Sequence, residues 1–461
     1  MMNNYSPVSC RVLPASASLL ILFILATAVF SQAGSAVTKS GVGRAASQAF
    51  TIGDLVIYRV GTGTSSLSGA AAAVFLDEYT TDGTFVRSIT MPTEVVGQAH
   101  RLVASGSSQY EGYLTRTANG RYLIVPGYDG PLGSAVIAMD ATAVNRVIGK
   151  VDGDGNVDTT SGFGDVASNA SISSAASIDG NSFWITGTKG GLRWSGSAPL
   201  SNVVSTSINN IQSVAIFDGQ LYVGSISGTI RMGTVGDGTP TSSGEIVTSL
   251  PGITTDITSP YGFYFADLSS QVPGMDTLYI ANDQTIANGG GVLKFCLIDG
   301  VWTASGRSPF VGLRGLTAGV SNDGVVSLYA TSASGLYSVT DTTGYNGVLS
   351  GAPTLLATAA VNTNFRGIAF APVSPSAADV TVTGRLVTSQ GAAVGQATVI
   401  LTSSSGTIQS AISNPFGYFS FPSLTAGETY VININARRAA FRPRTLSVED
   451  NISDLLMIAD E

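Results

Sequence analysis

The stretch Ser213–Gly224, with the sequence SVAIFDGQLYVG, decides the fold of this chain. An Asp-Gly pair separates two apolar runs, and this arrangement is a strong signal for a β-hairpin with a tight turn. The second run combines leucine, tyrosine and valine, which fit the pleated surface of a strand. The stretch therefore predicts two neighbouring antiparallel strands.

The same unit recurs along the chain, which indicates a repeat architecture. Five first strands lead to five second strands, each with an aromatic or aliphatic centre, across turns rich in Asp, Asn and Gly. The first strands are at 112–115, 174–177, 213–216, 262–265 and 315–318, and the second strands at 121–125, 182–185, 221–224, 277–280 and 327–330.

Two further segments lack a partner within their own repeat. Gly367–Phe370 resembles a first strand with no second strand after it, and Asp54–Arg59 resembles a second strand with no first strand before it. If these two segments pair, the chain closes into a ring. Such closure leaves few open sheet edges.

Outer strands complete the repeat. Val74–Tyr79 with Phe85–Ile89, and Asn145–Ile148 with Val157–Thr159, predict outer hairpins. Four strands in about 40–50 residues is the spacing of β-propeller blades. We therefore predict an all-β protein with a β-propeller at 49–373, with six blades favoured and seven possible. Stacked β-sandwiches are the alternative.

The composition supports an all-β chain and excludes some partners. Charged residues make up only 11% of the 461 residues, and 55 residues are glycine. Ordinary soluble proteins carry about 25% charged residues. The formal net charge of −8 offers no basic surface for nucleic acid or anionic membranes. We therefore expect no nucleic-acid partner.

The N-terminus predicts an export signal. Arg11 precedes an apolar run that starts at Leu19 and ends at Phe30, and Ser31–Ala33 forms a small-x-small cleavage site. We predict a signal peptide at 1–33, with an uncleaved anchor as the alternative, and an N-terminal extension at 34–48. The mature protein would be secreted, periplasmic or at the cell surface, without a membrane span.

The two cysteines predict that no internal disulfide forms. Cys10 would leave with the signal peptide, so Cys296 would remain alone. Cys296 lies in a strand-like run, where a buried, unreactive thiol is expected. The stability of the exported protein must then come from the burial of its hydrophobic core.

After a linker at 374–379, the pattern changes. Residues 380–461 contain six or seven short alternating strands, which predict a β-sandwich. The ordered segments 382–386 (VTGRL), 395–399 (GQATV), 414–419 (NPFGYF) and 424–427 (LTAG) resemble the carboxypeptidase regulatory-like domain. This resemblance implies a prealbumin-like sandwich of a broader carbohydrate-binding-like fold group and an accessory role. It does not imply peptidase activity. Tyr418, Phe419 and Phe421 each fit a core position.

Residues 259–267 resemble exported bacterial β-propellers, which implies a fold only.

One residue stands just before each first strand and is a candidate for ligand binding. In a ring, these six residues would lie at equivalent heights around the mouth of the central channel, where convergent polar groups can form a pocket. Arginine's planar fork suits a carboxylate or a cluster of sugar hydroxyls. The alternative is that Glu111 forms an ion pair with an arginine and the polar groups of the ring bind only one another. The six residues are Glu111, Ser173, Gln212, Tyr261, Arg314 and Arg366.

Other motifs give weaker signals. Residues 152–158 (DGDGNVD) imitate the start of a calcium loop, but the twelfth position is Phe163 in place of a bidentate Glu. A hairpin turn explains this composition better, and a calcium site remains a hypothesis; its ligands would be Asp152, Asp154, Asn156 and Asp158. His100 is the one imidazole available to a Ser-His-Asp site, and we expect it in a loop.

These observations favour an exported, non-enzymatic binding or scaffold protein that needs no cofactor. The propeller would be the platform for an extracellular glycan or protein ligand. The sandwich would be an accessory module, with carbohydrate binding as its candidate role. The alternative is a propeller hydrolase or lyase acting on a sugar or lactone at the central channel. The sequence leaves the ligand and the oligomeric state open.

Overall fold

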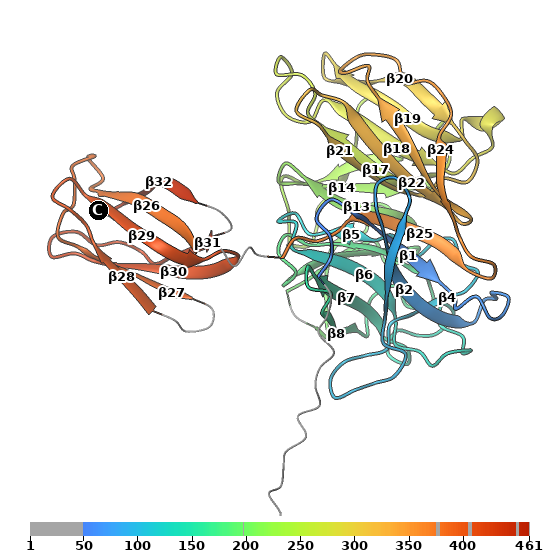
Figure 1. Ribbon diagram of the computed structural model, residues 1–461, viewed down its shortest axis with the longest axis horizontal. Coiled ribbons are helices and arrows are strands. Elements are labelled where there is room, and N and C mark those ends of the chain that lie inside the picture. The colour runs from blue at the N-terminus through green and yellow to red at the C-terminus, as the bar shows by residue number, and fades with distance from the viewer. Residues whose placement is uncertain (1–48, 197, 375–378, 404–407, 449–450, 461) are drawn as a thin grey trace, which may run out of the picture. The chain divides into compact units, whose positions relative to one another are not determined.

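The computed structural model describes residues 49–196, 198–374, 379–403, 408–448 and 451–460. Over these residues the secondary structure is strands β1 to β32 and one short 3₁₀ helix, η1 (Ile286–Asn288) (Figure 1). The predicted all-β class is confirmed. The predicted signal peptide at 1–33 and extension at 34–48 lie outside the described residues. No helix in the described part of the chain is long and apolar enough to cross a bilayer.

Four separate sheets of the propeller contain four strands each, and every strand pairs with its neighbours in the sequence. The inner hairpins fall where the Asp-Gly and related turns predict them. The strands are β9 (Ile172–Ala176), β10 (Phe183–Gly187), β11 (Leu192–Ser195) and β12 (Asn202–Ser205); β13 (Ile211–Phe217), β14 (Gln220–Ser225), β15 (Met232–Val235) and β16 (Val247–Ser249); β17 (Pro260–Ala266), β18 (Thr277–Asn282), β19 (Gly291–Ile298) and β20 (Val301–Pro309); and β21 (Gly315–Val320), β22 (Val326–Ser332), β23 (Gly335–Asp341) and β24 (Thr354–Thr358).

A fifth, nine-stranded sheet contains both ends of the propeller sequence. Its order is β25-β1-β2-β4-β6-β7-β8, with β3 paired to β2 and β5 paired to β6. The short strand β4 links two four-stranded groups, β25-β1-β2-β3 and β5-β6-β7-β8. The strands are β1 (Leu55–Val60), β2 (Ala71–Tyr79), β3 (Phe85–Thr90), β4 (Val103–Ser105), β5 (Thr115–Arg116), β6 (Tyr122–Tyr128), β7 (Arg146–Asp152), β8 (Val157–Phe163) and β25 (Asn364–Phe370).

The predicted closure of the ring is confirmed. β25 pairs antiparallel with β1, and Ile368 lies opposite Ile57 (Figure 1). The orange and blue strands that meet in the figure are more than 300 residues apart in the sequence. This pairing supplies the first strand that the repeat around β1 lacks, and it closes the ring by hydrogen bonds rather than by a disulfide.

The cores of the propeller lie between adjacent sheets. Phe217 at the end of β13 packs against three aromatic residues of β17, and the centroids of its ring and those of Tyr264 and Phe265 are each 5.4 Å apart. Aromatic side chains bury large apolar areas. Cys296 in β19 is fully buried, as predicted.

Residues 379–460 form a sandwich of two sheets. Strand burial alternates with period two, most clearly in β29, where Phe419 and Phe421 enter the core and Tyr418 points outward. The first strand begins at Asp379, one residue before the predicted domain boundary. One sheet has the order β29 (Tyr418–Thr425), β26 (Asp379–Val387), β32 (Ile452–Ile458), and the other β28 (Ile408–Ile412), β27 (Thr398–Ser403), β30 (Glu428–Asn435), β31 (Arg444–Val448).

Candidate functional site

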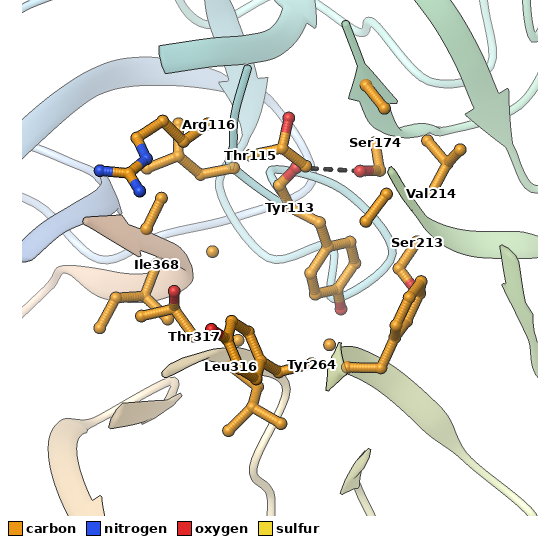
Figure 2. A pocket seen from close by; sticks show the side chains of 18 of the residues that line it. Tyr113, Thr115, Arg116, Ser174, Ser213, Val214, Tyr264, Leu316, Thr317 and Ile368 are labelled. Carbon is orange, nitrogen blue, oxygen red and sulfur yellow. Dashed lines mark hydrogen bonds between the residues drawn. The ribbon is translucent and has the colours of Figure 1, made fainter. Parts of the chain in front are cut away.

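The propeller encloses a central cavity of about 310 Å³. Its lining comes from the inner strands of the sheets, with side chains from several strands turned toward one space (Figure 2). This volume is at the lower end of the range for small-molecule sites. The lining residues fall within 113–118, 174–177, 213–217, 262–264, 315–318 and 367–370.

The inner strands approach one another closely because glycines stand at the points of contact. A Cβ atom at Gly262 would lie 2.6 Å from the backbone nitrogen of Leu316. At Gly367 it would collide with the backbone of Leu114. The Gly367 N–H donates to the Gly112 carbonyl at 2.9 Å. Glycine is required here for close packing around the axis.

Small hydroxyl side chains fasten the same strands to one another at the cavity wall. Thr115 Oγ1 donates to the Ala175 carbonyl at 2.6 Å, and Ser174 Oγ donates to the Tyr113 carbonyl at 3.1 Å. Ser213 Oγ donates to the next inner strand in the same way. Each hydroxyl uses its one hydrogen on a carbonyl, which leaves acceptor capacity on the oxygen. Ser174 has no exposed surface, so Thr115 and Ser213 are the hydroxyls that can present this capacity to the cavity.

Arg116 is the one charged residue among the described residues that line the cavity. Its side chain is exposed overall, and Nη1 donates to the Ala371 carbonyl at 3.2 Å. No carboxylate of the described residues lies within 4 Å of it. Partial desolvation lowers the pKa of Arg116 and the neighbouring Tyr264 opposes this change, but a guanidinium stays charged at neutral pH.

The predicted ring residues Glu111 and Arg366 are buried and bind each other. Arg366 Nη1 lies 2.8 Å from Glu111 Oε1, and the side chains are 5% and 1% exposed, respectively. Tyr128 Oη donates to Glu111 Oε2 at 2.7 Å. Arg366 also donates to the carbonyls of Ser105 and Gly106. The charges of Glu111 and Arg366 are therefore neutralised by partners within the protein.

Arg314 and Tyr261 form the second cluster of the predicted ring. Arg314 Nε donates to Asp283 Oδ2 at 2.8 Å, and its Nη2 donates to Gln109. Its guanidinium lies over the ring of Tyr261, 5.7 Å from the centroid. Tyr261 in turn packs against Tyr113, with ring centroids 5.4 Å apart. Tyr113 lines the cavity, whereas Tyr261 is not among its lining residues.

Ser173 and Gln212 complete the predicted ring, and both are fully buried. Gln212 Nε2 donates to Asn210, while Ser173 Oγ and Gln212 Oε1 have no hydrogen-bond partner among the described residues. The six predicted residues precede the cavity residues on the same inner strands by one or more positions. We call their level the charge-paired level.

The sequence did not single out four residues of the cavity wall: Thr115, Arg116, Tyr264 and Thr317. Comparing the repeats at the positions that follow the predicted ring residues would have pointed to them.

A wider, open groove of about 670 Å³ lies among the loops that precede the inner strands. Its lining is mostly polar, and Tyr110 is 45% exposed there. Lys189 is the charged residue in the groove. The groove therefore also carries a single cation, but in solvent and without an enclosing wall.

The predicted calcium segment is the turn between β7 and β8. Asp152 accepts backbone N–H groups from Asp154 and Asn156 at 3.0 and 2.8 Å, and Asp158 binds Thr160. Among the described residues, no three His, Cys, Asp or Glu side chains are grouped to hold a metal ion. The turn is explained by its own hydrogen bonds, and calcium binding stays a prediction.

His100 lies outside the strands, in a loop as expected. Its Nδ1 is 2.9 Å from Asp129 Oδ2, and the same carboxylate binds Arg101. Neither His100 nor Asp129 lines the central cavity. The imidazole therefore has a local partner away from the candidate site.

The outer face of the sandwich carries two exposed aromatic residues. Phe416 is 69% exposed and Tyr418 50% exposed. Arg385 lies opposite Tyr418 on the neighbouring strand, with its guanidinium 5.2 Å from the ring centroid. The core position considered for Tyr418 is wrong, because Tyr418 is exposed while the next residue, Phe419, is buried.

Comparisons with known proteins identify the C-terminal part of the chain. Residues 381–452 match the family model of the carboxypeptidase regulatory-like domain, which confirms the resemblance seen in the sequence. A search of curated proteins gives no match.

Solved structures with similar folds are distant. The extracellular domain of a putative one-component system from B. thetaiotaomicron is 11% identical, with 90% of this chain and 60% of that chain covered and a TM-score of 0.35. This chain thus spans about 60% of that relative. A protein from Lactobacillus plantarum is 11% identical, with 80% and 99% covered and a TM-score of 0.35. The WD40 domain of Toxoplasma gondii coronin is 10% identical, with 88% and 86% covered and a TM-score of 0.31. The propeller assignment rests on the strand pairing of the chain itself.

Proposed function

We propose that this chain is an exported, non-enzymatic binding protein that holds an extracellular ligand in the central cavity of its propeller. The observation that carries the proposal is the cavity of about 310 Å³, whose wall combines hydroxyl groups, apolar side chains and one cation. An apolar pocket with a few convergent polar groups is the usual form of a small-molecule site.

The chemistry of the cavity wall favours binding over catalysis. Its described lining residues include no carboxylate, imidazole or thiol. Hydrolases and lyases commonly use such groups as general acids, bases or nucleophiles. Reversible binding needs only shape, hydrogen bonds and charge, and the wall supplies all three.

The accessory role of the sandwich and the export of the chain are parts of the same proposal. The segment at 1–33 has the layout of an export signal. Phe416 and Tyr418 leave aromatic area in solvent on the sandwich, as surfaces used for recognition often do. A glycan is the ligand class that suits both an exported protein and a regulatory-like accessory module.

The proposal is tested by filling the cavity. Thr317 points into it from β21, and a Thr317→Trp variant would occupy its volume (Figure 2). Thr340 lies exposed on β23 of the same sheet, so Thr340→Trp is the matched control. A glycan and metabolite screen should find a ligand that the wild type and Thr340→Trp bind and Thr317→Trp does not.

Two results would count against the proposal. If Thr317→Trp folds and keeps every ligand of the wild type, the cavity is not the binding site. If a sugar or lactone is converted to product during the screen, the hydrolase or lyase alternative replaces it.

A further inference from the structure

The arginines of the propeller differ in whether a carboxylate neutralises them. Arg314 and Arg366 at the charge-paired level are each bound to an acidic side chain. Arg116, at the cavity, binds a backbone carbonyl and has no carboxylate partner among the described residues. The chain has 30 acidic residues against 22 basic ones, and none of the acidic residues lines the cavity. The cavity therefore offers a positive charge to an anionic ligand.

The hydroxyl groups of the wall set a second requirement on the ligand. Thr115, Ser174 and Ser213 donate their hydrogens to backbone carbonyls. What each retains is acceptor capacity, which suits a ligand that carries O–H donors. A plain fatty acid satisfies the cation but not these acceptors, whereas a sugar acid satisfies both.

Apolar side chains set a third requirement. Val214, Leu316 and Ile368 belong to lining strands, but their side chains pack mainly in the cores between sheets, so the apolar surface offered to a ligand comes from the ring of Tyr264 and the edge of Leu316 (Figure 2). These surfaces suit the C–H faces of a small ring rather than a fully ionised, strongly hydrated ion. A cavity of about 310 Å³ has room for one such ring.

We infer that the cavity binds a sugar acid, with its carboxylate on Arg116 and its hydroxyl groups on Thr115 and Ser213. The inference rests on the proposed binding function and names its ligand class. Arginine holds a carboxylate through two parallel N–H donors, so the fork of Arg116 gives orientation as well as charge. The sugar acid can be free or can be the end of an acidic polysaccharide, because both present the same group.

The first experiment is titration calorimetry of the purified protein with glucuronate, glucose and trigalacturonate. Glucose differs from glucuronate by the lack of the carboxylate, so it is the matched neutral probe. We expect glucuronate to bind at least about tenfold more tightly than glucose, as one charge-assisted hydrogen-bonded pair supplies such a factor. Galacturonate, titrated alongside, is the matched monomer for trigalacturonate. Tighter binding of the trimer than of this monomer would identify a polysaccharide end as the source, and weaker binding a free sugar acid.

The second experiment changes the cation. Arg116→Gln should weaken glucuronate binding about 10- to 100-fold. Arg116→Lys should give an intermediate loss, because it keeps the charge without the planar fork. Lys189→Gln removes one positive charge from the open groove, and should leave the affinity within about twofold. Circular dichroism of each variant checks its folding.

The outcomes separate the inference from the proposed function. Equal binding of glucose and glucuronate, no binding of glucuronate, or a folded Arg116→Gln with unchanged affinity overturns the sugar acid. A larger loss in Lys189→Gln than in Arg116→Gln also overturns it and places the anion in the groove. If another ligand then depends on Thr317, the binding function stands without the sugar acid, and if none does, both fail.

Discussion

The charge-paired level and the cavity use the same inner strands in opposite ways. At the charge-paired level, Glu111 and Arg366 neutralise each other in the buried interior, and Arg314 is held by Asp283. At the cavity, Arg116 has no carboxylate partner among the described residues, and the hydroxyl groups of the wall retain acceptor capacity. A charged residue near a channel axis therefore indicates ligand binding only when no opposite charge of the protein itself already neutralises it.

The physical reason lies in desolvation. A buried charge costs several kcal/mol unless it is paired and hydrogen-bonded, so Glu111 and Arg366 are stable only together. A partly exposed arginine such as Arg116 keeps much of its hydration, and a ligand can replace the rest. Stability and ligand affinity should therefore respond to mutation at different levels of the channel.

The largest effect is expected when the buried pair is broken. Glu111→Gln leaves Arg366 charged and without its partner, which should lower the free energy of unfolding by about 3–5 kcal/mol. Urea or thermal denaturation measures the loss. Glu94→Gln, at an exposed position, is the control and should change little. A loss below about 1 kcal/mol for Glu111→Gln would mean that this level does not hold the ring together.

The second largest effect concerns alkaline pH. Burial raises the pKa of Tyr261 to about 12, with Arg314 opposing and Asp283 reinforcing the shift. The unfolded phenol titrates near 10, so this contribution is full below pH 10 and is lost as pH rises toward 12. Each pH unit in that window should cost the folded state up to about 1.4 kcal/mol.

Tyr261→Phe should remove this part of the alkaline loss. Denaturation midpoints at pH 9 to 12 measure it for the wild type and the variant. Tyr418→Phe, on an exposed side chain, controls for the loss of one phenol. Parallel pH profiles for wild type and Tyr261→Phe would contradict the burial argument.

A smaller effect is expected at the half-buried pair. Asp283→Asn keeps the shape of the side chain but leaves Arg314 without its counter-charge. We expect a loss of about 1 kcal/mol, between the values typical of exposed and buried pairs. The exposed Asp256 provides the matched Asp256→Asn control. A loss as large as that of Glu111→Gln would show that both clusters are equally important.

The smallest effect on stability is expected at the cavity. Arg116→Gln should change the free energy of unfolding by no more than about 0.5 kcal/mol, because the side chain is exposed and makes no ion pair with the described residues. The same denaturation experiment measures it. A loss above about 2 kcal/mol would mean that Arg116 is structural, which would remove the contrast between the levels.

Much of the fold followed from local patterns. Ser213–Gly224 predicted β13 and β14 because an Asp-Gly pair between apolar runs favours one hairpin. The unpaired segments at residues 54–59 and 367–370 predicted the pairing of β1 with β25. Alternation did not place Tyr418, since a period of two leaves either face open until the opposite sheet is known.

The candidate site was less accessible to sequence reasoning. The repeat alignment found the six strands that surround the axis, but it singled out the residue just before each strand, such as Arg314, by its position in the repeat. Thr115, Arg116 and Tyr264 lie further along the same strands and had no distinguishing motif. Side-chain pairing depends on contacts between strands that are far apart in the sequence, so the alignment could not separate satisfied groups from available ones.

The sequence by itself determined the β-class, the ring order of the inner strands and the regulatory-like sandwich, because turns, alternation and family motifs are local. Only the tertiary structure decided which charges neutralise each other. Arg366 meets Glu111 across 255 positions, while Arg116 meets no acidic group of the described chain. The ring closure that the sequence predicted therefore also separates a level whose charges are paired from a cavity whose cation has no carboxylate partner among the described residues.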